Sequence, residues 1–198
     1  LSGLTVQAIA QSFPFLQSLA KFAQGGEVAA RDVTTFARNA AEREAAVALK
    51  VLFDRHGSDK ANYHNYHHLY GAILAQREAV EAVFEIGLGT NNTDVASNMG
   101  EQGKPGASLR AFREFCPHAQ VYGADIDRRV LFSEDRIKTF FIDQTDPASF
   151  APILAELEPR FDLVIDDGLH SPNANFASLE FALQLVKPGG WAVIEDIA

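Results

Sequence analysis

The sequence predicts an α/β fold built on a doubly wound parallel sheet. Three observations support this. Short apolar segments alternate with helix-like segments from residue 82 onward, which is the pattern of parallel strands covered by helices on both faces. A glycine-rich turn follows the first apolar segment, and acidic residues follow the others. Because ligands of such sheets bind beyond the carboxyl ends of the strands, the pattern also predicts where a site would lie.

The composition of the 198 residues fits one globular domain, with 47% hydrophobic and 22% charged residues. The net charge of −9 disfavours nucleic acid or a membrane surface as the main partner, because both attract a basic surface. No apolar run approaches the length of a membrane span. Cys116 is the single cysteine of the sequence and has no internal partner for a disulfide, so we expect a cytoplasmic location.

Residues 1–54 are predicted to form a helical N-terminal extension. Apolar residues recur there at spacings of three and four, and Gly25-Gly26 divides the region into two helices. These helices carry no chemistry, so we expect them to pack against the rest of the chain or to join copies into a homo-oligomer.

Residues 55–80 are predicted to form a lid or linker helix. A turn at residues 57–59 leads into a helix that runs to about Glu78. The segment HGSDKANYHNYHHLY, residues 56–70, concentrates four histidines and three tyrosines. Aromatic packing at a helix start would explain it, and so would a lid on the substrate side of a site. Under the second interpretation, the candidate substrate contacts are Asp59, Lys60, His64 and Tyr66.

Residues 81–198 form the predicted core. Strands are expected over 82–86, 120–124, 139–142, 163–165 and 191–194, and helices near 109–115, 147–156 and 173–186. A turn is expected over 187–190, where the sequence reads KPGG. The polar segment 90–107 separates the first strand from its helix. So long a loop in a compact domain is usually functional or disordered, and we expect it to be mobile without a ligand.

The turn after the first strand, Glu85-Ile86-Gly87-Leu88-Gly89, is the first candidate for binding chemistry. Glycines without Cβ atoms let a ligand approach the backbone closely. The third glycine of the dinucleotide fingerprint is missing, because Asn92 stands in its place. That absence argues against a pyrophosphate. It favours a cofactor with an amino-acid tail, whose ammonium group would be tolerated beside Glu85.

The ends of the second and third strands supply further candidates. Asp125 ends the second strand, where an acid can accept both hydroxyls of a ribose. Asp143 and Gln144 end the third, where the edge of an adenine would lie. Each of them would also serve as a simple cap of its strand. Their order along the chain favours a nucleoside site.

Four acids, Asp166, Asp167, Glu195 and Asp196, follow the fourth and fifth strands. Carboxylates gathered at one site repel one another, so a cation is expected, and all-oxygen ligands favour Mg²⁺ or a similar hard ion. Neighbouring strand residues point to opposite faces, so the last two can converge only where the strand has begun to turn. Simple exposure to solvent is the alternative. The residues alone leave open whether Asp166 or Asp167 is a ligand.

His170 follows this acid pair in the same loop. A neutral histidine beside a bound cation is a suitable general base near neutral pH. A lone loop histidine is otherwise a surface residue, and only its position beside the acids favours catalysis.

Taken in order, the segments FEIGLG, GASLRAF, VYGADID, FIDQTD, LVIDDGLH and KPGGWAVIED resemble the metal-dependent sugar O-methyltransferases of macrolide biosynthesis, the macrocin and mycinamicin type. The segment GSDKANYHNY resembles the family's Gly-[Ser/Thr]-Asp-Lys segment. The resemblance covers about residues 55–198. It implies a Rossmann-like class I methyltransferase fold that binds S-adenosylmethionine and Mg²⁺ and methylates a hydroxyl of a small, glycosylated natural product.

The resemblance also implies roles for individual residues. The cofactor contacts would be Glu85, Gly87, Gly89, Asp125, Asp143 and Gln144, and the Mg²⁺ ligands would be Asp167, Glu195 and Asp196. His170 would deprotonate the acceptor hydroxyl. Asp167 is favoured over Asp166 because it stands three residues before the histidine, as the family's ligand does.

Two other functions stay open. One is a nicotinamide-dependent oxidoreductase, and the other is a non-catalytic protein that binds the nucleoside cofactor and assembles through its N-terminal helices. A class I methyltransferase has seven strands, so the last two are expected to be missing from this chain, which ends at Ala198.

Overall fold

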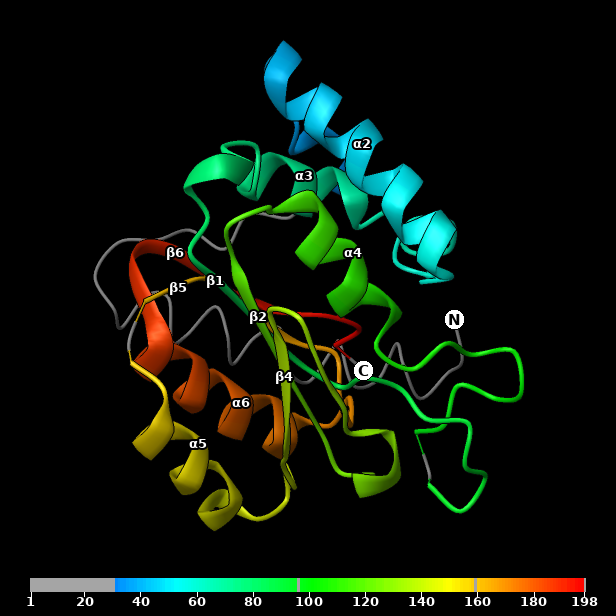
Figure 1. Cartoon of the computed structure of the whole chain (residues 1–198), viewed down its shortest axis with the longest axis vertical. Helices are drawn as coiled ribbons and strands as arrows, with labels where there is room; N and C mark the ends of the chain where they lie inside the picture. The colour runs from blue at the N-terminus through cyan, green and yellow to red at the C-terminus, as the bar shows by residue number, and fades with distance from the viewer. Residues whose placement is uncertain (1–30, 96, 159, 198) are drawn as a thin grey trace.

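The computed structural model describes residues 31–95, 97–158 and 160–197 and shows an α/β fold around one sheet (Figure 1). The sheet has the strand order β3-β4-β2-β1-β5-β6. Its strands are β1 (Ala82–Ile86), β2 (Gln120–Asp125), β3 (Ser133–Glu134), β4 (Ile137–Phe141), β5 (Phe161–Asp166) and β6 (Val186–Ile194). All neighbours pair in parallel except β3, which is antiparallel to β4. The predicted doubly wound sheet is confirmed.

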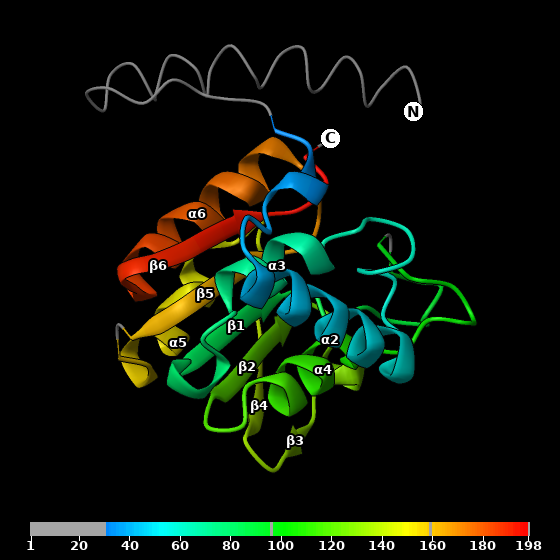
Figure 2. The same ribbon diagram turned by 90° about the horizontal axis from the view of Figure 1, so that it is seen from above.

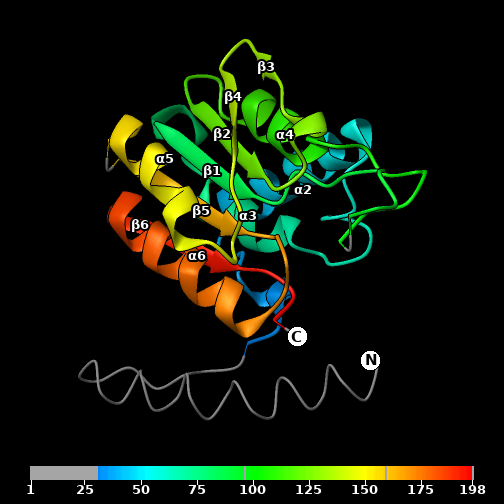
Figure 3. The ribbon, with the colours of Figure 1, turned by 90° about the horizontal axis from the view of Figure 1, so that it is seen from below.

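Helices cover both faces of the sheet (Figures 2 and 3). One layer holds α2 (Ala40–His56), α3 (His67–Ile73) and α4 (Ala107–Phe115), and the other holds α5 (Ala151–Glu156) and α6 (Pro172–Leu185). Four 3₁₀ turns complete the described elements: η1 (Val33–Thr35), η2 (Arg77–Ala79), η3 (Arg128–Val130) and η4 (Pro147–Phe150).

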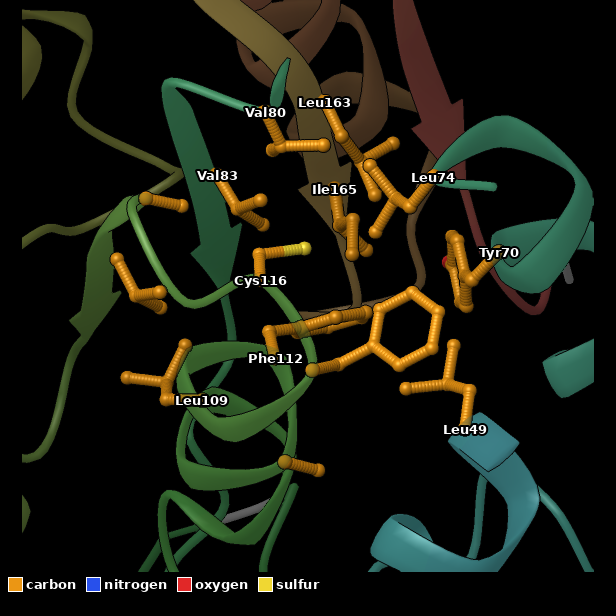
Figure 4. Close-up of a cluster of buried hydrophobic side chains, with 14 of the residues drawn as sticks. Leu49, Tyr70, Leu74, Val80, Val83, Leu109, Phe112, Cys116, Leu163 and Ile165 are labelled. Carbon is orange, nitrogen blue, oxygen red and sulfur yellow. The ribbon is translucent and has the colours of Figure 1, made fainter. Parts of the chain in front are cut away.

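Each layer has its own hydrophobic core, because successive strand residues face opposite sides of the sheet. Val83 of β1 belongs to the cluster beneath α2, α3 and α4, and its neighbour Phe84 belongs to the cluster beneath α5 and α6. Figure 4 shows the first cluster, in which the ring of Phe112 lies at 5.6 Å from that of Tyr70. Phe84 meets Phe181 of α6 at 5.1 Å.

The helix α2 is part of this core. Asn39 caps its start by accepting a hydrogen bond from the Glu42 amide, and Gly57 ends it in the left-handed conformation, with φ of 82°. Leu49 and Phe53 are fully buried in the first cluster. The predicted pair of N-terminal helices and their predicted self-association concern mainly residues 1–30. These residues lie outside the described part of the chain. The division of the chain at residues 54 and 80 stays a prediction.

Two predicted local structures are wrong. The helix expected to follow the turn at residues 57–59 and to run to about Glu78 is reduced to α3. Residues 59–63 form turns, and Asn65 adopts a left-handed φ of 58°, which interrupts a helix. The turn expected over 187–190 lies within β6. Phe161 pairs with Val186 and Leu163 with Trp191, so a bulge absorbs the extra residues of β6.

Within the described part of the chain, none of the helices is both long and apolar enough to cross a bilayer.

Candidate active site

The carboxyl ends of β1, β2, β4, β5 and β6 surround a pocket of about 630 Å³. Residues 57–60, 63 and 64 line another side, and residues from the long loop after β1 complete the wall. Most residues predicted from the sequence line this pocket: Asp59, Lys60, His64, Glu85, Gly87, Gly89, Asp125, Asp143, Gln144, Asp167, His170, Glu195 and Asp196. The structure therefore brings the cofactor, metal and base candidates to one place.

The glycine turn after β1 packs directly against the turn after β5. Gly87 has a φ of 93°, and a Cβ atom there would lie 2.0 Å from the carbonyl oxygen of Asp167. The amide of Asp167 donates to the carbonyl of Ile86 at 2.8 Å. Only a residue without a side chain fits here, so Gly87 sets the distance between the two strand ends.

Asp125 is buried and fixes the same turn from the side of β2. Its two carboxylate oxygens accept hydrogen bonds from the amides of Leu88 and Asp127, each at 2.8 Å. Burial raises the pKa of Asp125, although these backbone bonds oppose the shift. Each carboxylate oxygen has a second lone pair. Asp125 can therefore hold the turn and still accept from a ligand hydroxyl in the pocket.

Asp127, two residues beyond, was missed by the sequence reasoning. Its carboxylate accepts from Thr90 Oγ1 at 2.7 Å, Asn92 Nδ2 at 2.8 Å and Arg129 Nε at 2.6 Å. The hydrogen bond from the Arg129 side chain is the main cause that holds the pKa of Asp127 well below its usual range. Asp127 thus ties the loop after β1 to the end of β2. Its position two residues past a strand-end acid was the available signal.

Gln144 joins the ends of β4 and β5 and the helix α6. Its amide nitrogen donates to Asp166 Oδ1 and Ser178 Oγ, both at 2.7 Å, and its Oε1 accepts from the amide of Leu169 at 2.8 Å. The Asp143 carboxylate accepts from the amide and hydroxyl of Thr145 in its own loop. Both residues line the pocket, and the side-chain amide of Gln144 already forms three hydrogen bonds within the protein.

The same network distinguishes Asp166 from Asp167. Asp166 is 3% exposed, and its other oxygen accepts from Asn175 Nδ2 at 2.9 Å. Its carboxylate is therefore committed to the interior. The carboxylate of Asp167, 26% exposed as a side chain, lines the pocket.

Lys60 lies at the centre of three carboxylates from three strand ends. Its Nζ is 2.6 Å from Asp167 Oδ2, 2.8 Å from both oxygens of Glu195 and 3.1 Å from Glu85 Oε1. The Lys60 side chain is 3% exposed. The structure thus places Lys60 behind the pocket surface, where its ammonium group is held by the protein's own acids.

The charges of this group depend on one another. Burial alone would lower the pKa of Lys60, but Asp167, Glu195 and Glu85 together raise it well above its ordinary value. Burial raises the pKa of Glu85 and of Glu195, and Lys60 opposes both shifts. Lys60 therefore carries its proton at neutral pH. Neutral donors complete the cluster, with Ser108 Oγ donating to Glu85 at 2.5 Å and the Tyr70 hydroxyl donating to Glu195.

In front of Lys60, three side chains converge in a way that suits a hard cation. Asp167, His170 and Asp196 each offer a ligand atom, and these atoms lie within 4.8 Å of one another. Asp196 reaches this position because it follows the end of β6 with a left-handed φ of 45°. The Nδ1 atom of His170 is buried without a hydrogen-bond partner among the described residues. The carboxylates of Asp167 and Asp196, with Glu195 beside them, are donors that fit a hard divalent cation, and His170 lies next to that position.

The candidate substrate residues separate into two kinds. Lys60 and Asp59 both line the pocket, but Lys60 is buried whereas Asp59 is exposed. His64 and Tyr66 stack at 5.3 Å, and the Tyr66 hydroxyl donates to Asp196 Oδ1 at 2.7 Å. The turns between α2 and α3 therefore reach the acid group directly.

Comparison with known proteins gives a consistent result. The 8-demethyl-8-alpha-L-rhamnosyl tetracenomycin-C 2'-O-methyltransferase of Streptomyces olivaceus is 33% identical over 159 residues, which is 80% of this chain and 40% of that protein. The mycinamicin VI 2''-O-methyltransferase of Micromonospora griseorubida is 41% identical over 92 residues, 46% of this chain and 23% of that protein. No family model matches the chain.

The solved structures agree. The crystal structure of the MycE methyltransferase from the mycinamycin biosynthetic pathway, in complex with Mg and SAH, superposes with a TM-score of 0.62 at 32% identity, covering 75% of this chain and 39% of that one. The chain belongs to the sugar O-methyltransferases of the macrocin and mycinamicin type. The chain spans about 40% of the length of the Streptomyces olivaceus relative.

Proposed function

We propose that this sugar O-methyltransferase family member transfers the methyl group of S-adenosylmethionine to a hydroxyl of a small, glycosylated natural product, assisted by Mg²⁺. The observation that carries the proposal is the pocket that joins the Gly87 turn and Asp125 on one side to Asp167, His170 and Asp196 on the other. The printed functions of the relatives support it: one is named for a rhamnosyl substrate, and MycE has been crystallised with Mg, SAH and Mycinamycin VI.

The nucleoside half of the cofactor is assigned to the ends of β1, β2 and β4. Gly87 and Gly89 leave room for a ligand against the backbone, and Asp125 accepts from the ribose hydroxyls. Asp143 and Gln144 form the wall at the adenine edge. Glu85 is fully buried and contacts Lys60. It would therefore act on the methionine end of the cofactor through the combined charge of the group around Lys60.

The acceptor half is assigned to the ends of β5 and β6. Asp167, Glu195 and Asp196 are the carboxylates that would hold Mg²⁺, and Asp167 and Asp196 already face the pocket. A bound divalent cation would lower the pKa of the acceptor hydroxyl and fix its position. His170, next to this group, accepts the hydroxyl proton as the methyl group leaves sulfur, and the pocket walls hold donor and acceptor in line.

Calorimetric titration of the full chain with S-adenosylhomocysteine and, separately, with NADH tests the cofactor assignment. We expect S-adenosylhomocysteine to bind and NADH to fail, because the turn lacks the third glycine that a pyrophosphate requires. Binding of NADH alone would contradict the proposal and favour an oxidoreductase. Binding of S-adenosylhomocysteine by a protein that never consumes the methyl donor would favour a non-catalytic binder.

A further inference from the structure

The Lys60 ammonium group has used all of its hydrogen-bonding capacity inside the protein. An ammonium group has three N–H donors, and three carboxylates lie within 3.1 Å of Nζ: those of Glu85, Asp167 and Glu195. With a side chain 3% exposed, Lys60 has no free N–H donor for a substrate, although it lies in the pocket wall. Its function must therefore lie within this group of acids.

The carboxylates outnumber the ammonium. The group holds three acids and one lysine, so ionisation of all three would leave two more negative than positive charges in a buried place, and Asp196 lies nearby. Buried charges are costly unless paired. Tyr70 and Ser108 supply hydrogen bonds but no charge. The group therefore has room for further positive charge beside Lys60, on the side where Asp167 and Asp196 meet the pocket.

Lys60 and a divalent cation share two of the same partners. Asp167 presents Oδ2 to Lys60, and its Oδ1 lies 3.8 Å from His170 Nε2 on the outer side. Both oxygens of Glu195, another proposed ligand, face Lys60 at 2.8 Å. A cation that takes up these carboxylates must lie close to the ammonium, and like charges at such separations repel strongly in a buried site.

We propose that Lys60 is the resident counter-ion of the acid group, a positioning residue that competes with the divalent cation for Asp167 and Glu195. Without the cation, it keeps the acids assembled at the ends of β1, β5 and β6. With the cation, it lowers the affinity of the site, so that the cation binds reversibly. This inference rests on the proposed function, because it requires that a divalent cation binds beside Asp167.

The test is a titration of the full chain with Mn²⁺, followed by electron paramagnetic resonance of the free ion, on wild type and on Lys60→Met. We expect Lys60→Met to bind Mn²⁺ at least tenfold more tightly, because one positive charge is gone and two carboxylates are released. Lys60→Arg keeps the charge and is expected to bind no more tightly than wild type. Lys50→Met, which removes an exposed ion pair with Asp54, is the matched control and should bind as wild type does.

Thermal unfolding with and without Mn²⁺ gives a second reading if Lys60→Met folds poorly alone. Three unpaired acids should lower its unfolding temperature, and Mn²⁺ should raise it by more than in wild type. Equal or weaker Mn²⁺ binding by Lys60→Met, with no larger stabilisation, would overturn the role of Lys60 alone. Absence of Mn²⁺ binding by wild type would instead contradict the metal part of the proposed function.

Discussion

His170 is the residue on which the proposed chemistry depends most. It lies in the loop after β5 with a left-handed φ of 51°, and its side chain is one-third exposed at the pocket. Left-handed backbone is unfavourable for a residue with a side chain. Here the packed turns after β1 and β5 hold that conformation, and it places the imidazole beside Asp167.

Replacing His170 by alanine should reduce turnover by about 10²- to 10⁴-fold, the usual contribution of a general base. The affinity for S-adenosylhomocysteine should stay within about threefold of wild type, because the ribose and glycine-turn contacts lie on other strands. Steady-state kinetics and calorimetry on the same preparation measure both quantities. His118→Ala is the control, since His118 is 70% exposed as a side chain and does not line the pocket. Undiminished turnover in His170→Ala would remove the residue from the mechanism.

His67 gives a prediction about stability and pH. It is 5% exposed in α3, and burial lowers its pKa to about 4. The nearby His68 and Lys50 contribute to this lowering, while Asp54 opposes it. The folded protein therefore keeps His67 neutral where the unfolded chain, with a pKa near 6.5, takes up a proton. The stabilisation is full above pH 6.5 and is lost as the pH falls toward 4.

When the pH is lowered from 7 to 5, proton uptake by His67 in the unfolded chain should lower the free energy of unfolding by up to about 2 kcal/mol. Urea unfolding at both pH values measures the loss. His67→Gln should show a smaller loss over this interval, whereas His118→Gln, at an exposed position, should keep the wild-type difference. An identical pH dependence in His67→Gln and wild type would show that His67 is not the group responsible.

At the scale of elements, the contact between α2 and α3 positions the residues that reach the acid group. Gly71 of α3 is buried against α2, and a Cβ atom there would lie 2.4 Å from the Cα atom of Ala46. The neighbouring atoms belong to the backbone, so they cannot rotate away. The preceding residue, Tyr70, donates to Glu195, so the spacing of the two helices is linked to the site.

Gly71→Ala should therefore destabilise the protein by about 2 kcal/mol. Overpacking against backbone atoms should cost about 3 kcal/mol, the upper end of the usual range, and the gain in helix propensity should offset about 1 kcal/mol. A shift of α3 should also weaken Mn²⁺ binding through Tyr70 and Glu195. Denaturant unfolding and metal titration of the variant measure the two effects. A Gly71→Ala protein as stable as wild type or more stable would show that the two helices separate without cost.

Elements whose pattern is local and regular could be predicted from the sequence. The strand 82–86 is apolar except for Glu85 and has the predicted bounds. The strand-end acids lie at one edge because parallel strands end together. The two-residue β3 and the bulge in β6 could not be predicted, since both depend on pairing with a distant strand. The left-handed φ of Asn65, which prevents a long helix, leaves no periodic signal.

Most residues predicted for the site line one pocket, but their contacts with one another were not predicted. The sequence predicted an acid group of Asp167, Glu195 and Asp196 that binds a metal, and placed Glu85 separately beside the ammonium group of a cofactor. The structure shows that a lysine from the segment before β1 already lies among them. Lys60 is 25 residues from Glu85 and 135 from Glu195, and no pattern of spacing identifies contacts over such separations.

At the scale of the whole molecule, the sheet brings together two groups of strand ends, to which the proposed function gives different roles. The strands β1, β2 and β4 present the glycine turn and the polar strand ends, and β5 and β6 present the acids and His170. Two hydrophobic cores, one beneath each helical layer, hold the strand ends in register. Donor and acceptor would thus meet above the centre of the sheet, where β1 and β5 are neighbours.

The most direct test of this account is transfer of an isotope-labelled methyl group from S-adenosylmethionine to a panel of glycosylated natural products, with Mg²⁺ and with a chelator. We predict label on a hydroxyl of at least one glycoside in the presence of Mg²⁺ and none after chelation. Transfer that is equally fast with the chelator, or failure to label any hydroxylated acceptor by a protein that binds S-adenosylhomocysteine, would contradict it.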